Sequence, residues 1–194
     1  VGELSGEGLI QGNDEQRVRV GMSNSAAVSS AQRWPSLEAP YLLVYQLNIE
    51  APLSLSEGAE LRFVQGSSLR VDGEGSLSVV GSAARPVKLL GEEESLGFWR
   101  GLQFKTINEA IRLEHVELGY AGQRWTGAAE SLAAVHVSRS ATLALTSVRF
   151  HHLNGAALYV DPNASLTSCA ELSLEDSDGP LLQTESAHID PSCL

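Results

Sequence analysis

Residues 133–155, AAVHVSRSATLALTSVRFHHLNG, and residues 156–179, AALYVDPNASLTSCAELSLEDSDG, are two copies of one pattern. In each copy, short runs carry apolar residues at alternate positions, and turn residues separate the runs. Residues 180–193 begin a third copy, so the steps between copies are 23 and 24 residues. Alternation of period two is typical of half-buried strands, and self-similarity at a longer period is typical of a coil that returns above itself. The pattern therefore predicts stacked repeats of short strands.

The same pattern extends toward the N-terminus. From residue 53 onward, four apolar pairs start eight residues apart, so three strand-plus-turn units occupy 24 residues. Residues 111–118 precede the matching positions 143–150 by a constant 32 residues. The surplus over 24 lies mostly in residues 119–132, which we interpret as an insertion loop, a place where binding residues concentrate. A tolerated insertion without a role is the alternative.

These periods predict a fold class and a division of the chain. We expect an all-β protein, a single-stranded parallel β-helix of about five or six repeats of about 24 residues, over residues 41–194. Residues 17–40 are expected to form an N-terminal cap, because the open end would otherwise expose unpaired strand edges. Residues 1–16, rich in glycine and acidic residues, are expected to form a flexible lead-in.

The composition disfavours several classes of protein. The chain has 194 residues, with 24 acidic and 13 basic side chains, and its net charge is -11 with histidine neutral. Only two of the basic residues are lysines, so no basic stripe is available for nucleic acid or an anionic bilayer. A hydrophobic share of 43% against 19% charged residues disfavours disorder. No apolar run is long enough to predict a transmembrane segment, and we expect the signal of an exported protein to have been removed.

The two cysteines, Cys169 and Cys193, lie 24 residues apart, which is the step between repeats. They should occupy corresponding places on consecutive repeats, about 4.8 Å apart, within the range of a disulfide. A disulfide would indicate an oxidising, extracytoplasmic setting. Two buried, reduced cysteines are the alternative.

A series of distinctive segments follows along the chain in the order Trp34, Pro40-Tyr41, Leu53-Ser54-Leu55, Gly58, Leu61-Arg62-Phe63, residues 75–79, residues 81–87 and residues 97–104. The series resembles one known group, the right-handed parallel β-helices of the pectate-lyase-like superfamily, and within it secreted bacterial members. The resemblance implies a right-handed coil and an exported protein displayed at the cell surface. In its most specific segment Gly97 and Gly101 flank Trp99, which we interpret as a buried structural corner in preference to a platform for sugar rings.

Enzymes of this family cut acidic polysaccharides with carboxylates that project outward from neighbouring repeats. In this chain the corresponding outward column is Gln103, His136, Tyr159 and Gln183, and it contains no carboxylate. Together with Trp125 in the adjacent loop, we expect this column to be an exposed surface that binds polysaccharide, because aromatics and amides suit sugar rings. An ordinary sheet face without a ligand is the alternative.

Two further clusters have the composition of metal sites. Asp176 and Asp178 could offer oxygen ligands to Ca²⁺, and a solvated acidic turn is the alternative. His151 and His152 could suggest a metal site, but neighbours in a strand point to opposite faces, so they cannot both bind one ion easily unless the turn bends there. We expect a surface pair instead. No other cofactor is expected.

We therefore expect an exported, non-catalytic binding or adhesion module whose partner is polysaccharide or another surface protein. A polysaccharide lyase or glycoside hydrolase is one alternative. It would require a carboxylate cluster facing a groove beside an arginine: Arg100, Arg112, Arg124 or Arg149. A purely architectural spacer in a surface assembly is the other alternative.

Overall fold

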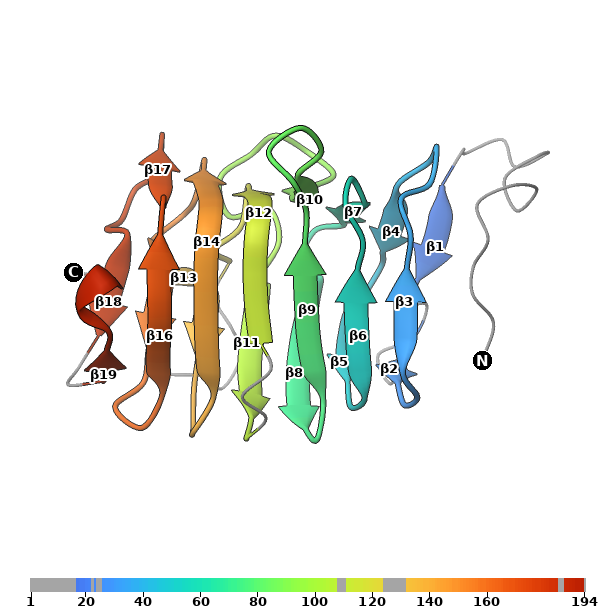
Figure 1. The fold of residues 1–194 in the computed structure, drawn as a ribbon. Helices are drawn as coiled ribbons and strands as arrows, with labels where there is room; N and C mark the ends of the chain where they lie inside the picture. Colours follow the sequence, from blue (N-terminus) through green and yellow to red (C-terminus); the bar gives the residue numbers. More distant parts are fainter. Residues whose placement is uncertain are drawn as a thin grey trace.

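The computed structural model of the protein describes residues 17–21, 23, 26–107, 111–123, 132–184 and 187–193. Over these residues the chain is all-β, apart from one short 3-10 helix, η1 (Pro191–Cys193). Every strand pairing among them is parallel. The strands form a ladder in which successive repeats lie side by side, from β1 at one end to β17 and β18 near the other (Figure 1). The predicted all-β, parallel architecture is confirmed.

The strands of the described ranges belong to two sheets. The first sheet has 12 strands: β1 (Val18–Val20), β3 (Gln32–Trp34), β4 (Tyr41–Leu43), β6 (Pro52–Leu55), β7 (Glu60–Phe63), β9 (Ser76–Val80), β10 (Val87–Gly91), β12 (Ile111–Gly119), β14 (Thr142–His151), β16 (Ser165–Ala170), β17 (Ser173–Glu175) and β19 (His188–Ile189). The second sheet has seven strands: β2 (Ala27–Val28), β5 (Gln46–Ile49), β8 (Ser68–Gly73), β11 (Gly101–Thr106), β13 (Ala133–Val137), β15 (Ala156–Val160) and β18 (Leu182–Thr184).

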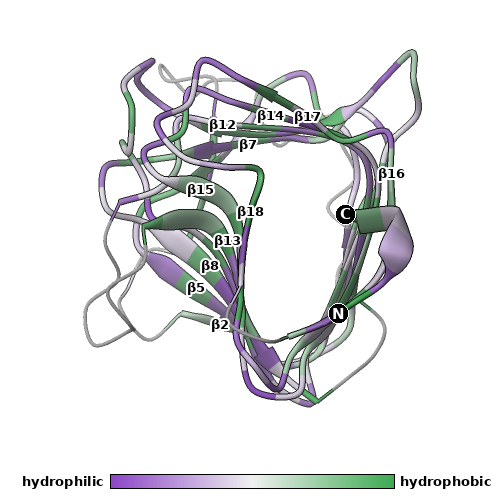
Figure 2. Ribbon diagram, turned by 90° about the vertical axis from the view of Figure 1, so that its left-hand side faces the viewer, coloured by the Kyte–Doolittle hydropathy of each residue, from purple (hydrophilic) through white to green (hydrophobic). Residues whose placement is uncertain are grey.

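The first sheet curls because its two longest strands bend. The first half of β12 pairs with β9 and its second half with β10, and His115 lies between the halves with φ 48°. In the same way β14 pairs with β16 and then with β17, and Ser147 has φ 52° at the bend. Positive φ is uncommon outside glycine, so these two residues mark a fixed corner. Viewed along the ladder, the first sheet forms two sides of the molecule and the second sheet the third, which is compatible with a β-helix-like solenoid (Figure 2).

Apolar side chains of both sheets fill the enclosed interior as one core cluster. The column Leu69, Leu102, Val135 and Leu158 is in register across β8, β11, β13 and β15, and each of these side chains is at most 1% exposed. The pairing of β12 with β14 joins residues 32 apart throughout, as the sequence predicts. Burying such stacked side chains stabilises the fold by about 1.5–3 kcal/mol each relative to full exposure.

Trp99 is the structural corner that the sequence predicts. It is fully buried, stacks on Phe63 with ring centroids 3.7 Å apart, and donates a hydrogen bond from Nε1 to the Gly119 carbonyl oxygen at 2.8 Å. Gly101 has φ 114°, and a Cβ there would lie 2.0 Å from the carbonyl oxygen of Ala134. A side chain at Gly101 is therefore excluded, and Trp99 offers no surface to a sugar.

The residues expected to cap the N-terminus contribute edge strands to both sheets. β1, β2 and β3 pair in parallel with β4, β5 and β6, so these three strands continue the strand pattern of the repeats that follow. Residues 1–16, the expected lead-in, lie outside the described residues.

The expected insertion loop, residues 119–132, begins inside the regular structure. Gly119 is the last residue of β12, and Ala121 forms a parallel bridge with Trp99. The backbone N–H of Asn154 donates to the Ala121 carbonyl oxygen at 3.0 Å. Residues 120–123 thus follow the neighbouring repeats, and residues 124–131 lie outside the described residues.

The predicted disulfide joins Cys169 of β16 to Cys193 of η1, with Cα atoms 4.7 Å apart. This distance matches the spacing of neighbouring strands, so the two cysteines do occupy adjacent repeats. The alternative of two reduced thiols is wrong for this structure. Among the described residues there is no helix whose length and apolar character would let it cross a bilayer.

Candidate functional site

The predicted binding column is assembled as expected, but it is not exposed. Gln103, His136, Tyr159 and Gln183 are in register across β11, β13, β15 and β18. Gln103 is 2%, His136 4% and Tyr159 6% exposed, and only Gln183 is open to solvent. The expectation of an exposed column is therefore wrong for three of its four residues. Alternation along a strand shows which face a side chain is on, and it does not show whether other atoms cover that face.

The buried part of this column is packed by its own neighbours. The His136 ring meets the Tyr159 ring edge-on at 5.0 Å, and its Nε2 lies 3.1 Å from Oδ1 of Asp161. Tyr159 also packs with Ala133 and Ala156 in a small apolar cluster separate from the main core. Trp125, expected beside the column, lies outside the described residues.

The acidic turn after β17 has one residue in a left-handed conformation. Asp176 has φ 45°, its side chain is 76% exposed, and its Oδ2 lies 3.9 Å from Nε2 of His152. Asp178 donates its backbone N–H to the Leu153 carbonyl oxygen. Within the described ranges there is no group of three His, Cys, Asp or Glu side chains placed to hold a metal ion. The turn thus gives no geometric support to the calcium alternative.

The histidine pair is not the surface pair that the sequence predicts. His151 ends β14 and is 4% exposed, whereas His152 follows with φ 51°, so the chain bends between them. The bend turns the two rings toward each other, with their Nδ1 atoms 3.1 Å apart. Nε2 of His151 lies 3.2 Å from Oε1 of Glu117, and Tyr120 packs edge-on against the His151 ring. Burial lowers the pKa of His151, and the charge of Glu117 acts in the opposite direction.

The first sheet carries a column of alternating charge that the sequence reasoning missed. Glu60, Lys88, Glu117 and Arg149 are in register across β7, β10, β12 and β14. The 32-residue offset between β12 and β14 could have revealed the last pair, since it places Glu117 beside Arg149. Opposite charges on directly neighbouring strands stabilise their pairing.

Arg149 is the best-connected member of this column. Its guanidinium contacts Glu117 Oε1 at 3.1 Å and Glu175 Oε2 at 2.7 Å. The hydrogen bond to Glu175 raises the pKa of Arg149, and the same hydrogen bond lowers the pKa of Glu175. Both groups therefore stay charged at neutral pH.

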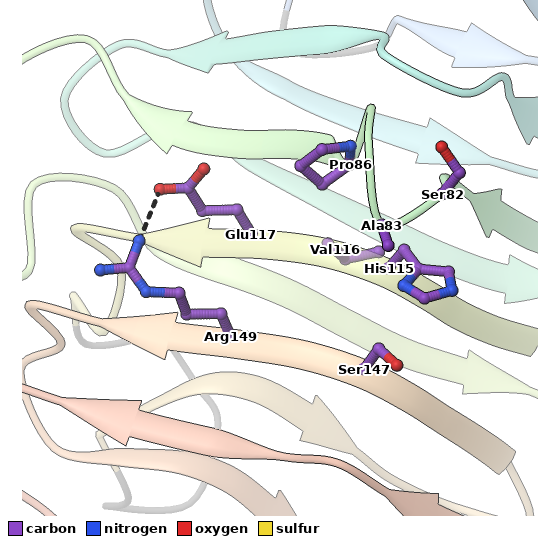
Figure 3. A pocket seen from close by; sticks show the side chains of 8 residues that line it. All are labelled: Ser82, Ala83, Pro86, His115, Val116, Glu117, Ser147 and Arg149. Atoms are coloured by element: carbon purple, nitrogen blue, oxygen red, sulfur yellow. Dashed lines mark hydrogen bonds and ion pairs between the residues drawn. The ribbon is translucent and has the colours of Figure 1, made fainter.

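A pocket of about 300 Å³ lies where β12 and β14 bend. It is lined by Ser82, Ala83, Pro86, His115, Val116, Glu117, Ser147 and Arg149. Figure 3 shows the Glu117–Arg149 pair at one end and His115, Ser82 and Ser147 at the other. We call this the corner pocket. The left-handed conformations of His115 and Ser147 place these two residues at its edge.

The corner pocket combines hydrogen-bonding groups with a small apolar surface. Arg149, the imidazole of His115 and the serine hydroxyls can donate, the Glu117 carboxylate accepts, and Pro86 and Val116 are apolar. Its volume lies at the lower end of the range for small-ligand sites. Such a lining suits a polar ligand with an apolar face.

A second, larger groove of about 460 Å³ lies on the β6, β9 and β12 side of the first sheet. It is lined by Pro52, Leu53, Ser54, Ser76, Ser78, Ile111, Arg112 and Ala144. Arg112 donates from Nε to the Ser78 hydroxyl at 3.0 Å. No carboxylate lines this groove, so the acidic cluster that an enzyme would need is not here.

No protein-family model, curated protein or solved structure matches the chain. The parallel, curled sheets are compatible with a β-helix-like solenoid, and the resemblance to the pectate-lyase-like superfamily rests on the segments of the sequence alone.

Proposed function

We propose that the chain is a right-handed, single-stranded parallel β-helix that acts outside the cytoplasm as a non-catalytic binding module, with a polysaccharide as its ligand. The parallel pairing of strands 20 to 34 residues apart supports the β-helix. The Cys169–Cys193 disulfide supports an oxidising location.

The corner pocket is the observation that carries the binding proposal. A sugar unit offers hydroxyl groups that donate and accept, and C–H groups that form an apolar face. Arg149, His115 and Glu117 supply the complementary polar groups, and Pro86 supplies an apolar contact. Because the pocket lies on a regular ladder, the sheet surface can contact further units of an extended chain.

The charges around Arg149 favour binding over catalysis. A lyase of the kind considered above needs a neutral base, and a hydrolase needs one protonated carboxyl group. Arg149 is held charged by Glu175, and the pKa of Glu175 is lowered in turn. Neither group can supply a proton or accept one readily near neutral pH.

A polysaccharide lyase or hydrolase is the second candidate, because one specific observation favours it. Glu117, Arg149 and Glu175 form the arrangement of carboxylates around an arginine that such an enzyme would require, and two of them line a pocket. Turnover of polyuronates by the purified protein with calcium present would establish this activity in place of pure binding.

A glycan array with the purified chain tests the binding proposal. We expect a ligand on the array, and about tenfold weaker binding for His115→Asn, because asparagine tolerates the positive φ but lacks the imidazole. Arg112→Gln, in the second groove, is the matched control and should bind as the unmodified chain does. An array without any ligand would instead favour a purely architectural spacer.

A further inference from the structure

A second cluster of charged side chains lies on the other sheet, where its parallel strands end. β8, β11, β13 and β15 are consecutive in the second sheet, and the carboxyl ends of parallel strands meet at one edge. The cluster consists of Arg70, Asp72, Lys105, His136, Arg139 and Asp161. It is separate from the corner pocket, which belongs to the first sheet.

Among the described residues, the ion pairs of this cluster leave one cation without a carboxylate partner. Arg70 contacts Asp72 at 2.5 Å, and Arg139 approaches the same carboxylate at 4.0 Å. Asp161 is occupied by His136, whose Nε2 is 3.1 Å away. Lys105 is in register with Asp72, yet no carboxylate in the described part of the chain lies within ion-pair distance of its amine. Three basic side chains, Arg70, Lys105 and Arg139, thus interact with two carboxylates, in a protein whose net charge is -11.

The surroundings of Lys105 disfavour the charged form of its amine. Burial lowers the pKa of Lys105, the charges of Arg70 and Arg139 lower it further, and Asp72 and Asp161 only partly oppose them. In addition, Nε of Arg70 is buried and has no hydrogen-bond partner among the described residues. An isolated surface lysine has no such neighbours, whereas the charges of two guanidinium groups act on this amine.

We propose that Lys105, Arg70 and Arg139 bind an oxyanion at the carboxyl ends of β8, β11 and β13. The ligand is a group with at least two acceptor oxygens, because guanidinium groups pair best with planar or tetrahedral oxyanions in a bidentate manner. Sulfate, phosphate and a carboxylate share this chemistry. The site does not depend on the corner pocket or on polysaccharide binding, so either proposal can fail without the other.

The two lysines of the chain allow a direct test. Reductive methylation with ¹³C-formaldehyde keeps the charge of each amine, and the spectrum then contains one signal each from Lys88 and Lys105 besides that of the amino terminus. A Lys88→Arg variant assigns the two signals. Lys88 is the internal control, since it lies on the other sheet between Glu60 and Glu117.

We expect sulfate, phosphate or acetate to shift the Lys105 signal in a saturable way and to raise its titration midpoint, with chloride at equal ionic strength as the reference. A larger shift with sulfate or phosphate than with acetate would indicate a tetrahedral ligand, and a larger shift with acetate would indicate a carboxylate. The Lys88 signal should not respond. If no oxyanion shifts the Lys105 signal more than chloride does, or if both lysines respond equally, the proposal is overturned.

An arginine variant tests the composition of the site. Arg139→Gln should weaken anion binding about tenfold, since it removes a charged donor. Arg33→Gln, on the first sheet, is the matched control and should bind the anion with unchanged affinity. Circular dichroism of both variants checks that they fold. Unchanged binding by folded Arg139→Gln would exclude the proposed site.

Discussion

Gly119 shows how one residue decides the packing around it. It is the last residue of β12, and a Cβ at this position would lie 2.2 Å from Cε1 of His151. The same glycine offers its carbonyl oxygen to the indole of Trp99. The absence of a side chain at Gly119 thus lets the buried histidine and the corner tryptophan pack on the same strand end.

We expect Gly119→Ala to lower the free energy of unfolding by about 1–3 kcal/mol, because it overpacks a closed site. Urea denaturation measures this difference. In a His151→Ala background the same substitution should cost much less, since the obstructing ring is gone. An equal cost in both backgrounds would show that the contact with His151 is not the cause.

The histidine pair predicts a dependence of stability on pH. Only one proton can lie between two Nδ1 atoms 3.1 Å apart, and burial lowers the pKa of His151 below its usual 6.5. The folded state therefore keeps His151 neutral while the unfolded state takes up a proton near pH 6.5. The stabilisation is complete above this pH and is lost as the pH falls below it.

Unfolding free energies measured between pH 7.5 and 5.5 should decrease toward acid pH, and His151→Gln should reduce the slope. His188→Asn is the matched control, because His188 is exposed on β19. The charged groups around the pair, Glu117, Arg149, Glu175 and Asp176, stay unchanged in all three proteins. A slope that His151→Gln leaves intact would assign the pH dependence to other groups.

For single residues, the sequence predicted the place of a side chain on its strand better than it predicted the groups that surround that side chain. The buried corner at Trp99 followed from its flanking glycines. The burial of His136 and Tyr159 could not be predicted, because alternation along a strand shows only on which face of the sheet a side chain lies. The bend at His152 was also missed, since nothing in its type requires a left-handed conformation.

Among the elements, β16 and η1 are the pair held by a covalent bond. Cys169 and Cys193 close a loop across one repeat, at the end of the ladder where strands are short. β19 has two residues and, among the described strands, pairs only with β16. The disulfide therefore fixes an element that backbone pairing alone holds weakly.

Replacing both cysteines by alanine should lower the free energy of unfolding by about 3.5 kcal/mol, the loop-closure value for a separation of 24 residues. Urea denaturation with and without a reductant provides the measurement. The reductant should destabilise the unmodified chain and leave the double variant unaffected. A reductant-insensitive unmodified chain would contradict this role of the disulfide.

The elements were largely predictable because the repeat fixes register. The 32-residue offset gave the pairing of β12 with β14 residue by residue, and the 24-residue step gave the disulfide. The bends at His115 and Ser147, which turn β12 and β14 around the corner of the sheet, were not predicted. They decide where the corner pocket lies, so the pocket could not be located from strand periodicity.

For the molecule as a whole, every strand pairing in the described ranges joins residues 20 to 34 apart in sequence. Each repeat thus depends on its two neighbours, and the end repeats have one neighbour fewer. Stability should therefore vary along the ladder, with the highest values in β11 to β14.

Hydrogen exchange followed by NMR should show this gradient. We expect the amides of β11, β12 and β13 to exchange slowest and those of β1 and β2 fastest, with the disulfide protecting β16 more than its position near the end would allow. Equal protection of all the strands would mean that the chain opens as a single cooperative unit.

The disulfide between β16 and η1 also has a mechanical consequence. If the chain is pulled by its two ends, the segment between Cys169 and Cys193 cannot extend until the covalent bond breaks. At about 3.4 Å per residue, the 24-residue separation corresponds to about 80 Å of contour length that does not contribute to the extension of the pulled chain. The opposite end is held by hydrogen bonds and packing alone, so we expect tension to separate the strands from β1 onward. The loop closed by Cys169 and Cys193 then remains at the C-terminal end.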